Sequence, residues 1–142
     1  METYNTERAK ELLEKLLYHA GLVKEIENEL DALRYRASGA GAIRYDKDHV
    51  MTSPQNYIEI AIQDIADVSR KLDKEKELFE ALLYDAYSII RQMKVPEQRI
   101  ALVMHYMNCK PWQEVETVLN ISKRKMFYIR NEALEEFGRL MK

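Results

Sequence analysis

The chain has 142 residues, about one ordinary domain, and 46% of them are hydrophobic, which excludes a chain that is disordered throughout. No apolar run approaches the roughly 18 residues of a membrane span, and the N-terminus is too charged for a signal peptide. The single cysteine, Cys109, leaves no partner for an intramolecular disulfide. We therefore expect a cytoplasmic protein without a membrane partner. The net charge of −2 says nothing about anionic partners.

The overall composition predicts an all-α fold. Only four glycines and three prolines interrupt a chain rich in Leu, Ile, Ala, Glu and Lys. We expect a long, coiled-coil-like N-terminal helical hairpin over residues 1–94 and a C-terminal helix-turn-helix module over residues 95–142.

Two long amphipathic helices are predicted for the N-terminal region. The first begins near Thr6, and its apolar stripe consists of Leu16, Val23, Ile26, Leu30, Leu33 and Ala37, broadened by Leu12, Leu13 and Leu17. The second runs from Pro54 to about Lys94, with Ile62, Ile65, Ser69, Leu72, Lys76, Phe79, Leu83, Ala86, Ile90 and Met93 in alternating steps of three and four. This alternation predicts left-handed supercoiling against a partner helix.

The first helix is the obvious partner for the second, folded back as a hairpin. Both stripes are broader than a two-helix contact needs, so we expect a homo-oligomer, a dimer or larger, built through the long helices. The alternative is a hairpin that only spaces and stabilises one protomer.

Residues 38–53 are predicted to form the connecting loop. Basic residues around it alternate with tyrosines, namely Arg34, Tyr35, Arg36, Arg44, Tyr45 and Lys47. Such a segment becomes ordered on a DNA backbone or on another protein, or it is only a mobile connector.

Three shorter helices are predicted after the Val95–Pro96 break. The first covers residues 97–108 and presents Ile100, Val103, Met104 and Met107 on one face. The second starts at Pro111, with Val115, Val118 and Leu119 inward and Trp112 as a core anchor. Asn120 tolerates the left-handed conformation that ends a helix, and Ser122 is a natural N-cap for the third. A short helix, a turn of about three residues and a longer helix are the elements of a helix-turn-helix.

The last helix carries the candidate DNA-binding residues. Its predicted core face is Met126, Ile129, Ala133, Leu134, Phe137 and Leu140. The residues left for DNA are Ser122, Lys123, Arg124, Lys125, Phe127, Tyr128, Arg130 and Asn131, a stretch with a net charge of +4 and no acid. A solvated helix face is the alternative, but such a face normally carries acidic partners four residues away.

Each of these residues has an expected role in the first turns of a recognition helix. Lys123 and Arg124 are expected at guanine O6 and N7, and Lys125 and Arg130 on phosphates. Phe127 and Tyr128 either touch a thymine methyl or pack against the 97–108 helix. Asn131 reads adenine or is only a surface residue.

The stretch from Pro96 to Met141 resembles the promoter-binding region four of bacterial sigma factors. The matching segment is "EVETVLNISKRKMFYIRNEAL", in which the pattern is carried by Val115, Leu119, Ile121, Ser122, Met126, Ile129, Ala133 and Leu134. The whole architecture more narrowly resembles the small late-gene transcriptional activators of phages of Gram-positive bacteria, the ArpU and RinA type. The resemblance implies activation of phage packaging and lysis genes, with RNA polymerase as a further partner.

Two residues depart from the helix-turn-helix pattern. Glu116 stands where a small residue normally lets the two helices approach, and a carboxylate buried there would cost several kcal/mol. We therefore expect a slightly opened crossing, or Glu116 turned outward toward a cation. Asn120 stands in the usual glycine position, which is a milder departure.

Catalysis, cofactors and metals find little support in the sequence. His105 and Cys109 are four residues apart, but structural zinc needs four ligands. Asp46, Asp48 and His49 lack the glycine and glutamate of a calcium loop. No phosphate-binding loop or nucleophile motif is present, so no enzyme, cofactor or metal is predicted. Besides a regulator, two functions remain: a phage small-terminase-like packaging protein, and a helical protein-interaction module without DNA binding.

Overall fold

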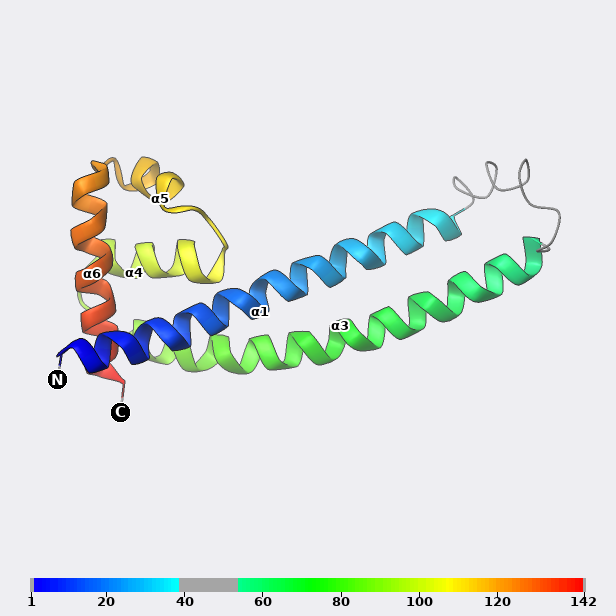
Figure 1. The fold of residues 1–142 in the computed structure, drawn as a ribbon, viewed down its shortest axis with the longest axis horizontal. Helices are drawn as coiled ribbons and strands as arrows, with labels where there is room; N and C mark the ends of the chain where they lie inside the picture. Colours follow the sequence, from blue (N-terminus) through cyan, green and yellow to red (C-terminus); the bar gives the residue numbers. More distant parts are fainter. Residues whose placement is uncertain (1, 39–53, 142) are drawn as a thin grey trace. The chain divides into compact units, whose positions relative to one another are not determined.

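The computed structural model describes residues 2–38 and 54–141, and within these ranges it contains five α-helices, one π-helical turn and no strand. The helices are α1 (Glu2–Ala37), α3 (Pro54–Ile90), α4 (Pro96–Leu102), α5 (Trp112–Leu119) and α6 (Lys123–Leu140), and the π-helical turn η1 (Val103–Met107) directly follows α4 (Figure 1). The all-α prediction is confirmed. The predicted loop lies, apart from Ser38, outside the described residues.

None of the helices in the described ranges combines the length and the apolar character that a membrane span requires. The long helices α1 and α3 carry buried apolar residues at steps of three and four and exposed charged residues between them, which is the pattern of amphipathic helices.

The contacts divide the chain into two compact units. Unit 1 contains Met1–Gly21 and Leu78–Lys142, and unit 2 contains Leu22–Glu77. The start of α1 and the end of α3 therefore belong to the same unit as α4, α5 and α6. The helix-turn-helix is not packed by itself, because the ends of the long helices complete its core.

Unit 1 has two apolar clusters. The main core combines α1, α3, α4, η1 and α6, through Ala9, Leu13, Leu16, Ala86, Ile90, Met93, Leu102, Tyr106, Met107, Ala133, Leu134 and Phe137. The outer core joins α4, α5 and α6 through Ala101, Val115, Met126 and Ile129. Trp112 is half-buried and packs against both clusters, which agrees with its predicted role as an anchor.

The described residues of unit 2 belong to α1 and α3, apart from Ser38. Its buried side chains are Val23, Ile26, Leu30, Ala61 and Leu72. The Glu27 carboxylate lies 4.0 Å from the Lys76 ammonium across the two helices. The predicted stripe of α1 is confirmed, whereas Ile62 of the α3 stripe is 59% exposed.

The helix α3 ends earlier than predicted, at Ile90 and not near Lys94. The helix α3 ends at Ile90 because the Gln92 and Met93 N–H groups donate to carbonyls three residues back, which tightens the last turn. Val95 is extended, as a residue before proline must be. The Arg99 Nη1 then donates to the Met93 carbonyl at 2.8 Å and fixes the start of α4 against the turn.

The inner faces of the two short helices differ from the prediction. Ile100 is 39% exposed and Val118 is 60% exposed, while Ala101 and Leu102 are fully buried. The prediction failed at α4 because its adjacent apolar residues point to different sides of the helix, so the sequence favours no single face. The Asn108 N–H donates to the Val103 carbonyl, five residues back, and this wider turn changes the angular spacing of the residues that follow.

The close approach of α6 to α1 requires a glycine. A Cβ atom at Gly138 would lie 2.3 Å from the backbone oxygen of Asn5. Only a residue without a side chain therefore allows the last turns of α6 to lie against the start of α1, and this contact holds α6 on the main core.

Candidate nucleic-acid interface

The turn between α5 and α6 has the local structure that the sequence predicts. Asn120 adopts the left-handed conformation, with φ 54° and ψ 52°, and the Ile121 N–H donates to the Glu116 carbonyl at 3.1 Å. The Ser122 hydroxyl then accepts from the Lys125 N–H at 3.1 Å and caps α6. A three-residue turn thus separates a short helix from an 18-residue helix.

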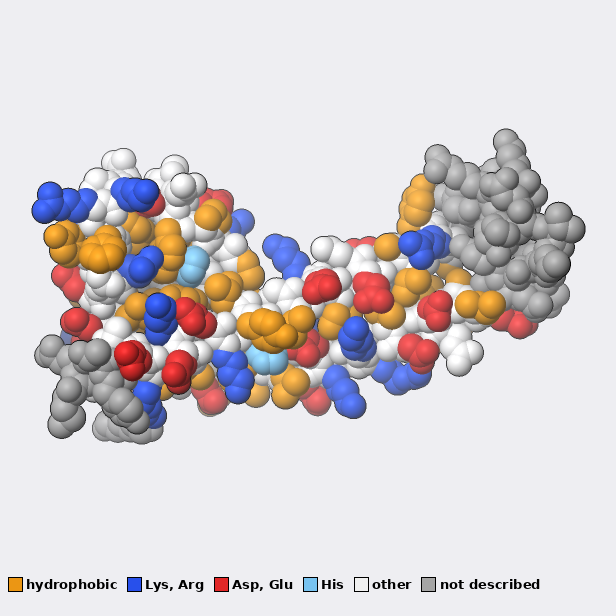
Figure 2. Space-filling model, viewed as in Figure 1, with side chains coloured by type: hydrophobic (Ala, Val, Ile, Leu, Met, Phe, Trp, Pro, Cys, Tyr) orange, Lys and Arg blue, Asp and Glu red, His pale blue; other side chains and the backbone are white. Residues whose placement is uncertain are grey.

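The side chains at the start of α6 separate into an inner and an outer face. Met126, Ile129, Ala133, Leu134 and Phe137 are buried, as predicted, and Leu140 is half-buried. Ser122, Lys123, Arg124 and Lys125 are exposed. Figure 2 shows Lys and Arg side chains at the end where α6 begins, with Asp and Glu side chains further along the helix.

Phe127 and Tyr128 lie beside these cations and are 53% and 50% exposed. Their rings meet edge to face with centroids 5.9 Å apart. Neither ring is buried against α4, which leaves both available to a ligand. Asn131 is half-buried, further along α6 than the exposed cations.

Arg130 differs from the other three cations because aromatic rings hold it. Its guanidinium carbon lies 5.4 Å from the centroid of the Trp112 ring and 5.9 Å from that of Phe127. Since Arg130 is half-buried, it occupies a more defined position than the first-turn cations. A fixed positive charge at this place suits a phosphate contact.

An aromatic group below Arg130 was not singled out from the sequence as part of the site. The His105 ring stacks on the Trp112 ring with centroids 3.9 Å apart, and the Tyr106 ring meets Trp112 edge to face at 5.9 Å. The signal available in the sequence was the closeness of His105, Tyr106 and Trp112 along the chain. Their mutual contact depends on the reversal of the chain at Cys109, which has φ 58°.

The titratable groups of this cluster are shifted by their surroundings. Burial lowers the pKa of His105 below 6.5; its hydrogen bond with the Lys110 carbonyl opposes this shift, and the positive charge of Arg130 reinforces it. Burial raises the pKa of Tyr106. Nδ1 of His105 lies 2.8 Å from the Lys110 carbonyl oxygen and is engaged there. Within the described ranges, no three His, Cys, Asp or Glu residues form a metal-binding group.

Glu116 is half-buried and is not enclosed between α5 and α6. It lines a surface hollow with Trp112, Lys123, Phe127 and Arg130. Glu116 therefore lies at the hollow that two of the candidate cations, Lys123 and Arg130, also line. The fully buried carboxylate is excluded, whereas the two expected alternatives, an opened crossing and an outward Glu116, both stay predictions. Glu116 lowers the net positive charge around this hollow by one.

The arrangement provides a capped, exposed and positively charged helix start, supported from beneath by Trp112. Such a helix start can bind an anionic surface of regular geometry. The chain matches no protein-family model, no curated protein and no solved structure.

Proposed function

We propose that the chain is a sequence-specific DNA-binding transcriptional regulator. The observation that supports this function best is the geometry of the turn. Asn120 and the Ser122 cap start α6 so that Lys123, Arg124 and Lys125 are exposed together, while Met126 and Ile129 hold the opposite face in the core. A helix presented in this manner is the element that enters the major groove.

The residues have different proposed roles in recognition. Lys123 and Arg124 reach base edges from the first turn, and Lys125 and Arg130 contact phosphates. Ser122 caps the helix, and Phe127, Tyr128 and Asn131 complete the surface. Symmetric pairing of the long helices would present two such helices to repeated half-sites and raise the affinity. The resemblance to phage late-gene activators suggests activation, in the cytoplasm and together with RNA polymerase, as the biological role.

The test is selection of duplexes from a random-sequence pool, followed by titration of the selected duplex. Replacing both Lys123 and Arg124 with glutamine should weaken specific binding by about thirtyfold or more, because each of the two base contacts contributes about 1–3 kcal/mol. The matched control replaces Lys24 and Lys71, which are exposed cations of unit 2. Affinity should also fall steeply with salt. Unchanged affinity of the first variant would overturn the assignment.

A helical protein-interaction module is the second candidate, and apolar exposure supports it. In unit 2, Ile58, Ile60 and Ile62 are about half exposed, and in unit 1 Tyr18 and Tyr84 are 64% and 73% exposed. If this function is the main one, no duplex is enriched from the pool, and binding of unselected DNA is weak and independent of Lys123 and Arg124.

A further inference from the structure

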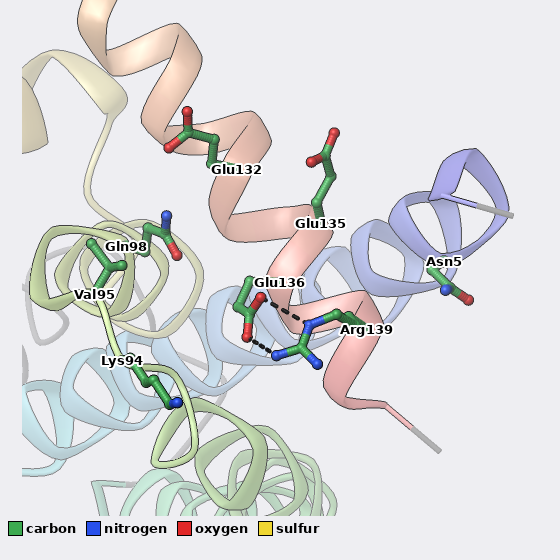
Figure 3. Close-up of a pocket in the computed structure, with 8 residues that line it drawn as sticks. All are labelled: Asn5, Lys94, Val95, Gln98, Glu132, Glu135, Glu136 and Arg139. Carbon is green, nitrogen blue, oxygen red and sulfur yellow. Dashed lines mark hydrogen bonds and ion pairs between the residues drawn. The ribbon is translucent and has the colours of Figure 1, made fainter.

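A second polar surface lies at the other end of α6, in unit 1. It is a hollow of about 570 Å³ between α6, the start of α4 and the start of α1 (Figure 3). Glu132, Glu135, Glu136 and Arg139 of α6 line it, with Lys94 and Gln98 opposite.

The carboxylates of the hollow are unequal. Arg139 binds Glu136 through two hydrogen bonds, Nε to Oε2 at 3.1 Å and Nη2 to Oε1 at 2.5 Å, and these bonds lower the pKa of Glu136. Glu132 and Glu135 are exposed and form no ion pair with a described residue. Three glutamates against Lys94 and Arg139 leave a net charge of −1. The C-terminal end of the α6 dipole adds partial negative charge.

Gln98 provides independent evidence for a ligand. The residue is only 8% exposed, and its side-chain amide forms no hydrogen bond with a described residue. The amide is not sealed in the core, because no enclosed side-chain polar atom without a partner occurs in the described residues. Figure 3 shows the amide extending from α4 toward α6, into the hollow. An amide that has no protein partner and opens into the hollow can bond to whatever occupies the hollow, whether water or a ligand.

We propose that this hollow binds a lysine or arginine side chain from a second copy of the same chain, and that the donor is the exposed start of its α6. Glu132 and Glu135 accept the charged group, and the Gln98 carbonyl oxygen accepts a further N–H. The alkyl part of the incoming side chain lies against Val95, which is 40% exposed.

Charge complementarity selects this occupant. The start of α6 carries three exposed adjacent cations, and the positive end of the helix dipole lies there. The hollow lies along the last turns of the same helix and has the opposite sign. Two copies with α6 antiparallel bring each start against the other hollow, so the contact is self-complementary and closes as a dimer contact.

The consequence for function rests on the proposed DNA binding. The contact uses Lys123, Arg124 and Lys125, the same cations that are assigned to DNA. Self-association through the hollow and binding of a duplex therefore exclude each other. A protein stored in this form releases its recognition helix only when DNA competes for it.

The test is sedimentation of the full chain without DNA, at low and at high salt, with charge-reversed variants. The start-reversed variant carries Lys123→Glu and Arg124→Glu, and the hollow-reversed variant carries Glu132→Lys and Glu135→Lys. Each variant alone should weaken the salt-sensitive association about tenfold or more, because like charges then meet. An equimolar mixture of the two variants should restore it. Gln98→Leu should weaken the association without any change of charge.

Each outcome decides the proposal. Absence of a salt-sensitive association in the wild type, or association that both reversals leave unchanged, overturns it, as does a mixture that fails to restore the contact. If a reversed variant loses helicity by circular dichroism, the pair Glu132→Gln and Glu135→Gln repeats the measurement with a smaller change. A random-sequence duplex added to the wild type should dissociate the contact. If the mixture of the two variants restores the association but DNA does not dissociate the wild type, the proposed contact stands and the proposed DNA binding by the start of α6 is rejected. If the chain binds DNA but the mixture restores no association, the proposed contact is rejected and the proposed DNA binding stands.

Discussion

The two units bury their side chains to different extents. In unit 1 the described residues include nine that are fully inaccessible, Ala9, Leu13, Leu16, Ala86, Ala101, Leu102, Val115, Ala133 and Phe137. In unit 2 every buried residue among the described ones keeps 4–8% of its surface exposed. Two helices side by side leave an open flank on each stripe, whereas five helical elements close around the main core. The candidate DNA-binding residues therefore lie on the better-packed unit.

The largest expected effect tests this difference in packing directly. Phe137→Ala should lower the free energy of unfolding by about 3–5 kcal/mol, because it leaves a cavity in a closed core. Leu72→Ala in unit 2 should cost about 2 kcal/mol, the low end for such changes, since water already reaches the site. Urea unfolding followed by circular dichroism measures both. Equal losses would show that unit 2 is closed by something else, such as a second copy.

A smaller effect is expected where α6 approaches α1. Gly138→Ala should cost about 1–3 kcal/mol, because the new Cβ atom meets the Asn5 backbone and the helices must separate. The matched control is Gly21→Ala, at the last residue of α1 that belongs to unit 1. No atom lies within 4 Å of a Cβ there. That change should stabilise by about 0.5–1 kcal/mol through helix propensity. Thermal melts of both variants would show opposite signs, and two stabilised variants would contradict the close contact.

The smallest effect concerns pH. Burial lowers the pKa of His105, so the folded state favours the neutral ring and binds fewer protons than the unfolded chain. This part of the stability is complete above the unfolded pKa of 6.5 and is lost as the pH falls through 6.5 to the folded pKa. Between pH 7 and about pH 5, above most carboxylate titration, the wild type should lose more stability than His105→Gln. Parallel curves for the two proteins would show that the ring is not held in a protected position.

The sequence predicted those features that depend on regular periodicity or on one residue. The α6 core face follows from one apolar stripe, and the Ser122 cap and the left-handed Asn120 follow from the preferences of those residue types. The prediction of the inner face of α4 was wrong because Ile100, Ala101 and Leu102 are all apolar and adjacent. The π-helical turn depends on tertiary contacts that no periodicity encodes.

Contacts between segments far apart in the chain could not be predicted from the sequence either. Gly138 shows no sign in its neighbourhood that α1 lies against it, since the contact joins residues more than a hundred positions apart. The same holds for Gln98, which resembles any polar residue of a short helix until α6 encloses it. The joint exposure of Lys123, Arg124 and Lys125 could be predicted because they adjoin one another on a single helix; their contact with DNA stays a prediction.

Trp112 has a practical consequence, because it is the only tryptophan of the chain. Its indole lies between the two apolar clusters, stacked on His105 and covered by Arg130. Intrinsic fluorescence excited at the indole band therefore comes from the place where Trp112 packs beside Arg130 of α6, and from no other part of the chain. A ligand that draws Arg130 away from the ring, or a proton that binds His105, changes the emission without any attached dye. The protein carries its own optical reporter at the place where its function is proposed.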